Sequence, residues 1–274
     1  MKKLILASAI SAAFAGGFAQ AEEAAKSDHV ISYNLGVTSD YVFRGISQSR
    51  NRPAFSGGVD YSHAPTGLYA GTWVSTISWI DDSYPASSVT DSSSRPRTPY
   101  EQDFYAGIKL GDAAGLNFDV GTIYYYYPRN KLHLESGYLG LKANTNEVYG
   151  KVAYGPVYFK ASYAIGDAIW VSNKSGSYYL DLGADVPVME GLTLNAHVGR
   201  FVFKQDTTIL TDSRYNYSDW KIGLTQDFGN GLSGSIAATG TNAKDTFNGS
   251  NVWNFNGTGY LGDTKGIVSL TKTF

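Results

Sequence analysis

A two-residue alternation of apolar and polar side chains is the feature that most limits how this sequence can fold. A clear example is the run Leu116, Asn117, Phe118, Asp119 and Val120, and the same rhythm recurs along most of the chain. Successive side chains of a β-strand point to opposite faces, so each such segment has one apolar and one polar face. No segment beyond residue 22 keeps a 3.6-residue apolar period, and the sequence therefore predicts an all-β protein.

The composition favours a transmembrane barrel among the all-β folds. The chain has 31 Gly, 21 Tyr, 13 Phe and 5 Trp but only 8 Pro and no Cys. Aromatic residues favour strands and glycine favours turns, while the lack of cysteine removes the disulfides that many exported sandwich domains use. The mean hydropathy of −0.21 argues against a helical membrane protein. It fits a barrel in which polar lumen residues alternate with apolar lipid-facing residues.

The chain begins with the pattern of a cleavable signal peptide. Lys2 and Lys3 precede an apolar stretch over residues 4–15, and Ala19, Gln20 and Ala21 form a small-x-small cleavage site. The apolar stretch is shorter than the roughly 20 residues that a spanning helix needs. We therefore predict a signal peptide over residues 1–21 and one exported barrel domain over residues 22–274.

The alternation predicts an antiparallel barrel of about twelve strands, with fourteen or ten strands as alternatives. The expected strands cover residues 31–46, 54–63, 68–80, 101–110, 116–127, 147–154, 157–165, 178–186, 192–203, 217–228, 232–241 and 265–274. Residues 81–100 and 136–144 are assigned to loops on the outer side. Short turns alternate with long connections, as in outer-membrane barrels, and an even strand number returns both chain ends to the periplasm.

The carboxy-terminal segment predicts where the protein goes. Gly266, Val268, Leu270 and Phe274 share one face of the last strand, although Lys272 interrupts it. A closing strand with an aromatic last residue resembles the segment that the bacterial barrel-assembly machinery recognises. We therefore expect insertion into the outer membrane of a Gram-negative bacterium, through Phe274, with outer-membrane lipid around the wall.

Residues 37–48, with the sequence VTSDYVFRGISQ, resemble the amino-terminal signature of the TorF-type porins, a proteobacterial family of largely unknown function. Weaker matches are residues 67–73, 119–121 with 124–128, 147–149, and Phe274. Residues 136–144 look like an insertion relative to the family pattern. The resemblance implies an outer-membrane barrel and suggests the passage of solutes, but it supplies no substrate.

The polar face of the predicted strands carries most of the charge, which predicts a charged lumen. The lumen-lining candidates are the acids Asp40, Asp60, Glu101, Asp103, Asp119, Glu147, Asp181, Asp185, Asp219 and Asp227, the bases Arg44, Lys109, Lys151, Lys160 and Lys221, and His197. Ten acids against five bases predict a passive channel for small polar solutes with a weak preference for cations. Arg95 and Arg97 make the loop over residues 81–100 a candidate constriction.

Arg44 is the lumen charge with the most specific hypothesis. Four strand residues span about 13 Å, so Asp40 and Arg44 cannot pair with each other on one strand. If the first two strands form a hairpin, Asp40 falls close to Asp60, and Arg44 would bridge acidic groups across the wall. Solvated, unpaired lumen charges fit the same pattern equally well.

Two other classes of function remain open in the sequence. A lipid-modifying barrel enzyme would need a nucleophile beside His197, but only Asn195 shares its face nearby, and no catalytic residue is predicted. A structural or receptor barrel fits the loops rich in Trp, Tyr and Asp. Four scattered histidines without cysteine predict no metal site and no cofactor. The net charge of −2 without a basic cluster argues against nucleic acid, and no oligomeric state is specified.

Overall fold

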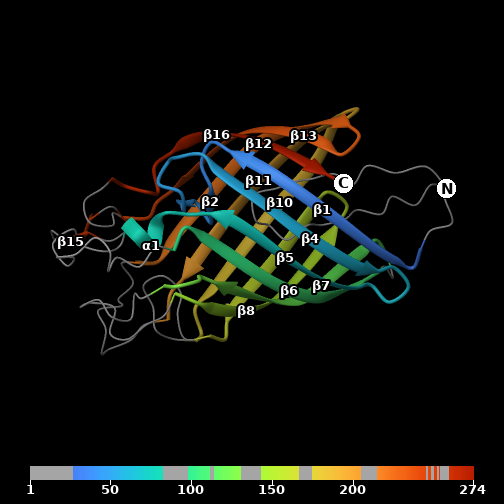
Figure 1. Cartoon of the computed structure of the whole chain (residues 1–274), viewed down its shortest axis with the longest axis horizontal. Coiled ribbons are helices and arrows are strands. Elements are labelled where there is room, and N and C mark those ends of the chain that lie inside the picture. Colours follow the sequence, from blue (N-terminus) through green and yellow to red (C-terminus); the bar gives the residue numbers. More distant parts are fainter. Residues whose placement is uncertain are drawn as a thin grey trace.

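The computed structural model describes residues 27–82, 98–111, 114–130, 143–166, 175–204, 215–244, 246–247, 250–251, 253 and 259–274. Twelve antiparallel strands close a barrel (Figure 1), which confirms the predicted fold class and strand number. The wall consists of β1 (His29–Thr38), β4 (Ala54–His63), β5 (Leu68–Thr76), β6 (Tyr100–Leu110), β7 (Leu116–Tyr126), β8 (Thr145–Tyr154), β9 (Val157–Ala164), β10 (Tyr178–Met189), β11 (Leu192–Val202), β12 (Tyr217–Gly229), β13 (Leu232–Thr241) and β16 (Lys265–Thr273). The first strand closes the barrel by pairing with the last.

The two ends of the barrel differ in their connections. Short turns join β4 to β5, β6 to β7, β8 to β9, β10 to β11 and β12 to β13 at the end where β1 begins and β16 ends (Figure 1), and we call this the turn end. The opposite end, the loop end, carries the short helix α1 (Trp79–Asp82) and the small hairpin of β14 (Thr246–Phe247) and β15 (Ser250–Asn251). Strands that follow one another in the sequence are thus neighbours in the wall.

The outer and inner faces of the wall differ in chemistry, as the alternation predicts. On β1, Ile31, Tyr33 and Leu35 are 59%, 52% and 59% exposed, whereas Ser32 and Asn34 between them are half-buried and face inward. Every wall strand exposes large apolar side chains in this way, so an apolar belt surrounds the barrel. Such a belt is unfavourable in water and is typical of barrels surrounded by lipid. No helix in the described ranges is long and apolar enough to cross a bilayer.

Two predicted strands are too long. β1 ends at Thr38 and not at residue 46, because Thr38 donates a hydrogen bond to the backbone oxygen of Asp40 and the chain then turns inward. Tyr41 and Phe43, predicted to face lipid, lie inside the barrel. β5 ends at Thr76, and the expected continuation to residue 80 is instead the start of α1. In both places apolar side chains pack inside the barrel. In the sequence they occupy alternate positions, as the outward-facing residues of a wall strand do, and this is why the strands were predicted too long.

Three predictions fall wholly or mostly on residues outside the described ranges. They are the signal peptide over residues 1–21, most of the loop over residues 81–100 with Arg95 and Arg97, and most of residues 136–144. β7 pairs directly with β8, with Thr122 opposite Val148, so no further wall strand lies between them.

The packed core lies inside the loop-end half of the barrel, in two clusters of buried apolar side chains. The first cluster contains Trp73, Trp79, Ile80, Tyr125 and Tyr127, among others. The second cluster contains Tyr179, Phe201, Phe203, Tyr217 and Trp253, among others. An empty, wholly polar bore would expose these side chains to water, so the clusters need a partner in the middle of the lumen.

Candidate functional site

The connection between β1 and β4 supplies that partner by folding into the barrel. We call residues 39–53 the inner hairpin, and it contains β2 (Val42–Phe43) paired with β3 (Ile46–Ser47). Arg44 and Gly45 form its tip, with φ angles of 47° and 78°. Two central residues with positive φ are typical of the tight two-residue hairpin turn. Tyr41 and Phe43 pack in the first cluster and Ile46 in the second, so the hairpin fills the space between them.

Arg44 fastens the tip to the far wall. Its guanidinium donates two hydrogen bonds to the Glu147 carboxylate, at 2.8 Å and 2.7 Å, and both side chains are buried. The hairpin leaves the wall at β1 and β4, while Glu147 lies on β8, with three strands between β4 and β8. The tip therefore crosses the bore.

Three aromatic rings surround the guanidinium of Arg44. The guanidinium carbon lies 4.7 Å, 4.5 Å and 4.9 Å from the ring centres of Phe43, Tyr179 and Phe201. Burial lowers the pKa of Arg44, but the Glu147 carboxylate together with the nearby Tyr125 and Tyr179 raises the pKa above its ordinary value. Arg44 thus remains a cation, paired by two parallel hydrogen bonds and stacked on aromatic faces, which is the strongest mode of arginine binding.

Asp40 organises the base of the hairpin. Its Oδ1 atom accepts hydrogen bonds from the hydroxyls of Ser47 and Ser49, at 2.5 Å and 2.9 Å. Its Oδ2 atom lies 3.4 Å from the ammonium nitrogen of Lys265 on β16. One carboxylate therefore joins both arms of the hairpin to each other and to the wall.

The predicted neighbourhood of Asp40, Arg44 and Asp60 is wrong. Asp60 pairs in register with Ser32, six residues below the top of β4 and so about 20 Å from it along the strand. Its carboxylate accepts a hydrogen bond from Tyr105 at 2.6 Å. The prediction failed because it continued the wall strand through residues that instead form the inner hairpin.

Tyr41 provides a second anchor on the opposite side of the hairpin. Its hydroxyl donates a hydrogen bond to Oε1 of Glu101 on β6 at 2.7 Å, and its ring meets Trp73 edge to face at 5.4 Å. Burial raises the pKa of Tyr41, and the carboxylates of Glu101 and Asp103 raise it further. The hydroxyl therefore keeps its proton and acts as a donor.

Gly45 allows the tip to approach the wall closely. A methyl group at this position would overlap the side chain of Thr241 and lie 2.7 Å from Cβ of Asp219. The φ of 78° adds strain for any residue with a side chain.

We expect Gly45→Ala to lower the free energy of unfolding in urea by about 1–3 kcal/mol, because the tip must move or strain. The matched control is Gly150→Ala on β8, where a methyl group would meet no atom within 4 Å. Equal stability of the two variants would show that the tip does not need its close contact.

Charged groups and tyrosines line the lumen toward the turn end. Inward-facing candidates there are Asp60, Asp119, Asp181, Asp185, Lys109, Lys151, Lys160, Lys221 and His197, while Asp219 lies beside the tip of the inner hairpin. Four of the acids accept hydrogen bonds from tyrosine hydroxyls, namely Tyr105 to Asp60, Tyr69 to Asp119, Tyr158 to Asp181 and Tyr179 to Asp219. We did not single out these four tyrosines from the sequence, although each lies on the polar face of its strand.

The remaining candidates lie elsewhere. Glu101, Asp103 and Glu147 are buried beside the inner hairpin, while Asp40 and Arg44 belong to it. Asp227 is exposed at the turn end, where its carboxylate accepts the backbone N–H of Gly229 at 2.8 Å. Arg95 and Arg97 lie outside the described residues.

His197 lies between two carboxylates. Its Nδ1 atom is 3.2 Å from Asp181, and its Nε2 atom is 3.8 Å from Asp219. Asn195 donates to Asp185 at 2.6 Å and accepts from Thr225 at 2.7 Å. In the part of the chain that the structure describes, no group of three His, Asp or Glu side chains is arranged to hold a metal ion.

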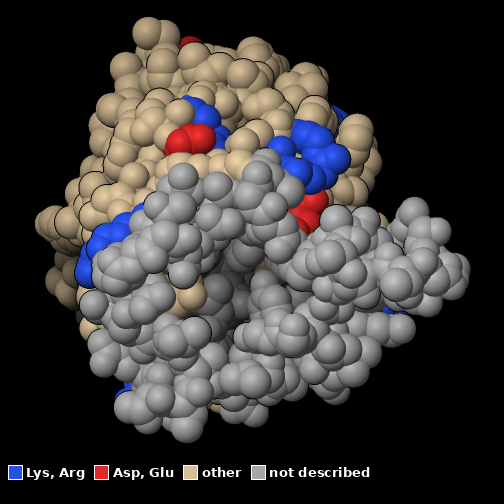
Figure 2. Space-filling model, turned by 90° about the vertical axis from the view of Figure 1, so that its left-hand side faces the viewer, with Lys and Arg blue, Asp and Glu red and all other residues tan. Residues whose placement is uncertain are grey.

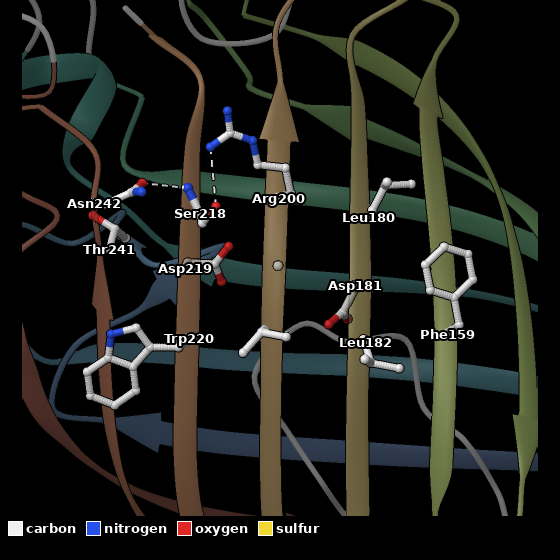
Figure 3. A pocket seen from close by; sticks show the side chains of 12 residues that line it. Phe159, Leu180, Asp181, Leu182, Arg200, Ser218, Asp219, Trp220, Thr241 and Asn242 are labelled. Carbon is white, nitrogen blue, oxygen red and sulfur yellow. Dashed lines mark hydrogen bonds between the residues drawn. The ribbon is translucent and has the colours of Figure 1, made fainter.

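The surface adds two features to the barrel. Seen from the loop end, basic and acidic side chains lie near one another on the described part of the rim (Figure 2). A hollow of about 520 Å³ lies on the wall, and its lining includes the apolar side chains of Phe159, Leu180, Leu182 and Trp220 and the polar side chains of Arg200, Ser218 and Asn242 (Figure 3). The apolar side chains of this lining are exposed on the outer face, so the hollow belongs to the outside of the wall.

Comparison with known proteins places the chain in a family without giving it an activity. A family model described as "Bacterial protein of unknown function (Gcw_chp)" matches residues 22–274. The chain belongs to this family. The Gcw_chp description carries neither the TorF-type label nor a substrate, and no curated protein matches the chain.

Three solved structures illustrate what the Gcw_chp protein is similar to. The KdgM porin is 8% identical, with a TM-score of 0.49, covering 89% of this chain and 98% of that chain. The outer-membrane channel DcaP of Acinetobacter baumannii is 10% identical, with a TM-score of 0.43, covering 94% and 100%. OccK5 of Pseudomonas aeruginosa is 12% identical, with a TM-score of 0.37, covering 91% and 68%.

Proposed function

We propose that the protein is a porin-like channel of the bacterial outer membrane, through which small polar solutes diffuse passively past the inner hairpin. The lumen is the observation that carries this proposal. Charged and hydroxyl groups line it inside a closed wall whose outer face is apolar. Burying so many ionisable groups in a barrel is costly unless water reaches them, and water in a transmembrane bore is a path for polar solutes.

The topology supports an orientation in the membrane. We place the turn end in the periplasm and the loop end outside, since short turns are periplasmic in such barrels. The signal peptide over residues 1–21 would direct export. Phe274 is 65% exposed on the outer face and its backbone N–H bonds to Tyr33, so its ring is available to the barrel-assembly machinery and then to lipid.

We assign the constriction to the inner hairpin. It crosses the bore and is fixed at both ends by buried polar contacts, Arg44 with Glu147 and Asp40 with Lys265. Conductance of the native protein should therefore be small for a barrel of twelve strands. Arg95 and Arg97, which the sequence suggested as constriction residues, lie outside the described residues.

The filled loop-end half also favours a second candidate, a structural or receptor barrel that conducts nothing. Recording from refolded protein in planar bilayers separates the two. Steady single-channel steps, absent with heat-unfolded protein in the same detergent, support the channel. Membranes that remain silent after confirmed insertion contradict it and favour the second candidate.

We expect a weak preference for cations, although less than the sequence alone suggests. Glu101 and Glu147 are bonded to the hairpin, Asp40 pairs with Lys265, and Asp227 lies exposed at the turn end with its carboxylate bonded to the backbone of Gly229. The remaining charges are Asp60, Asp103, Asp119, Asp181, Asp185 and Asp219 against Lys109, Lys151, Lys160 and Lys221. Reversal potentials across a KCl gradient measure the preference, and a reversal potential that favours chloride would disprove it.

A further inference from the structure

One row of charges crosses five neighbouring strands, β6 to β10, inside the lumen. Lys109 pairs in register with Asp119, Asp119 with Lys151, and Lys151 with Lys160, which in turn lies opposite Asp181. Neighbouring strands are about 4.8 Å apart, so the three lysines are distributed over roughly 15 Å of the inner wall. We call Lys109, Lys151 and Lys160 the lysine face.

The ammonium groups of the lysine face have no carboxylate partner within the described ranges. No carboxylate oxygen there lies within 4.0 Å of these three nitrogen atoms. Each ammonium instead lies over a tyrosine ring. The distances to the ring centres are 5.2 Å from Lys109 to Tyr69, 4.1 Å from Lys151 to Tyr158, and 4.1 Å from Lys160 to Tyr149.

The two acids of the row are engaged by other groups. Asp119 accepts a hydrogen bond from the Tyr69 hydroxyl at 2.6 Å. Asp181 accepts one from the Tyr158 hydroxyl at 3.3 Å and lies 3.2 Å from the His197 ring. The acids therefore reduce the positive potential of the row without occupying the hydrogen-bonding positions of the lysines.

Lys151 and Lys160 are the decisive pair. Like charges directly opposite each other on paired strands are destabilising, and the repulsion grows where the surroundings are less polar than bulk water. The neighbouring pairs on the same inner face, Tyr149 with Ser162 and Ala153 with Tyr158, are uncharged, so this part of the wall accepts uncharged side chains. Neither ammonium group has a carboxylate oxygen within 4.0 Å among the described residues, so a bound anion would relieve the repulsion between them.

We propose that the lysine face binds solutes with two or more negative charges carried on carboxylate or phosphate oxygens. This proposal rests on the channel function and names a class of solute for it. A compact multivalent anion can contact several ammonium groups at once, whereas a monovalent ion gains only one such contact. A local anion site is compatible with a weak overall preference for small cations, because that preference depends on every charge along the bore.

Titration calorimetry on the refolded full chain, at low ionic strength, tests the site with pyrophosphate and citrate as the probes. We expect both probes to bind, and we expect Lys151→Gln to weaken binding by about tenfold and Lys151→Gln with Lys160→Gln to weaken it further. Lys272→Gln is the matched control, because Lys272 lies over Phe274 at the turn end and outside the row. Binding of only one probe would restrict the class to phosphate or to carboxylate.

Failure of the site and failure of the channel give different results. The lysine face is disproved if the wild-type protein conducts but binds neither probe. It is also disproved if the double variant binds the probes as tightly as the wild-type protein. The channel proposal is unaffected by either result. Wild-type protein that binds pyrophosphate but never conducts overturns the channel and leaves the site. The same heat-dependent shift in electrophoretic mobility in all variants shows that the barrel has folded.

Discussion

Replacing residues 40–52 by a short Gly-Ser turn is expected to raise the single-channel conductance several-fold. β1 and β4 pair directly over their whole length, from His29 opposite His63 to Thr38 opposite Ala54, so the wall does not depend on the hairpin. The change removes the bulk that crosses the bore, including Tyr41, Phe43 and Arg44. The remaining charged lumen then becomes a wider aqueous path.

Planar-bilayer recording measures this effect, and the strand content of the variant, followed by circular dichroism, shows whether the barrel is retained. Conductance equal to that of the native protein, in a variant with a retained barrel, would mean that the narrowest point lies elsewhere. The loop over residues 81–100 would then be the next segment to shorten.

Arg44→Met is expected to lower the free energy of unfolding by about 3–5 kcal/mol, because it leaves the buried Glu147 carboxylate without its partner. Removing both charges in Arg44→Met with Glu147→Met should restore most of the loss, since a buried ion pair often contributes little relative to apolar side chains of similar volume. Urea titration followed by tryptophan fluorescence gives the free energies.

Arg50→Met provides the matched control for this prediction. Arg50 also pairs with a carboxylate, Asp82, at 2.8 Å, but 33% of the Arg50 side chain is exposed near the loop end. A pair with that exposure contributes about 0–1 kcal/mol. If Arg44→Met costs no more than Arg50→Met, the contact between Arg44 and Glu147 does not hold the hairpin in the lumen.

The wall of the barrel could be predicted from the sequence because each strand is recognisable from the alternation of its own residues. The strands over residues 54–63 and 232–241 have the predicted bounds, and most others differ by only a few residues. In each case the alternation itself specifies which side chains face lipid. The two-residue period and the strand count thus determine a closed barrel.

The inner hairpin could not be predicted in the same way. Ile31, Tyr33 and Leu35 face lipid, while Tyr41 and Phe43 on the same parity face packed aromatic rings inside the barrel. Alternation shows that one face of a strand is apolar. It does not show whether that face contacts lipid or an apolar cluster in the lumen. Gly45 is the one residue of the segment over residues 42–45 that favours a turn. Because the apolar alternation continues on both sides of it, the sequence did not predict a turn there.

A barrel with an apolar exterior and a charged interior follows from the alternation, because a period of two assigns each side chain to one face of its strand. Which charges meet depends on how the strands pair and on how the wall closes. Arg44 and Glu147 are 103 residues apart, and Lys151 and Lys160 become opposite neighbours through the pairing of β8 with β9. Closure of the wall brings such residues together, and no local pattern encodes distances across a bore.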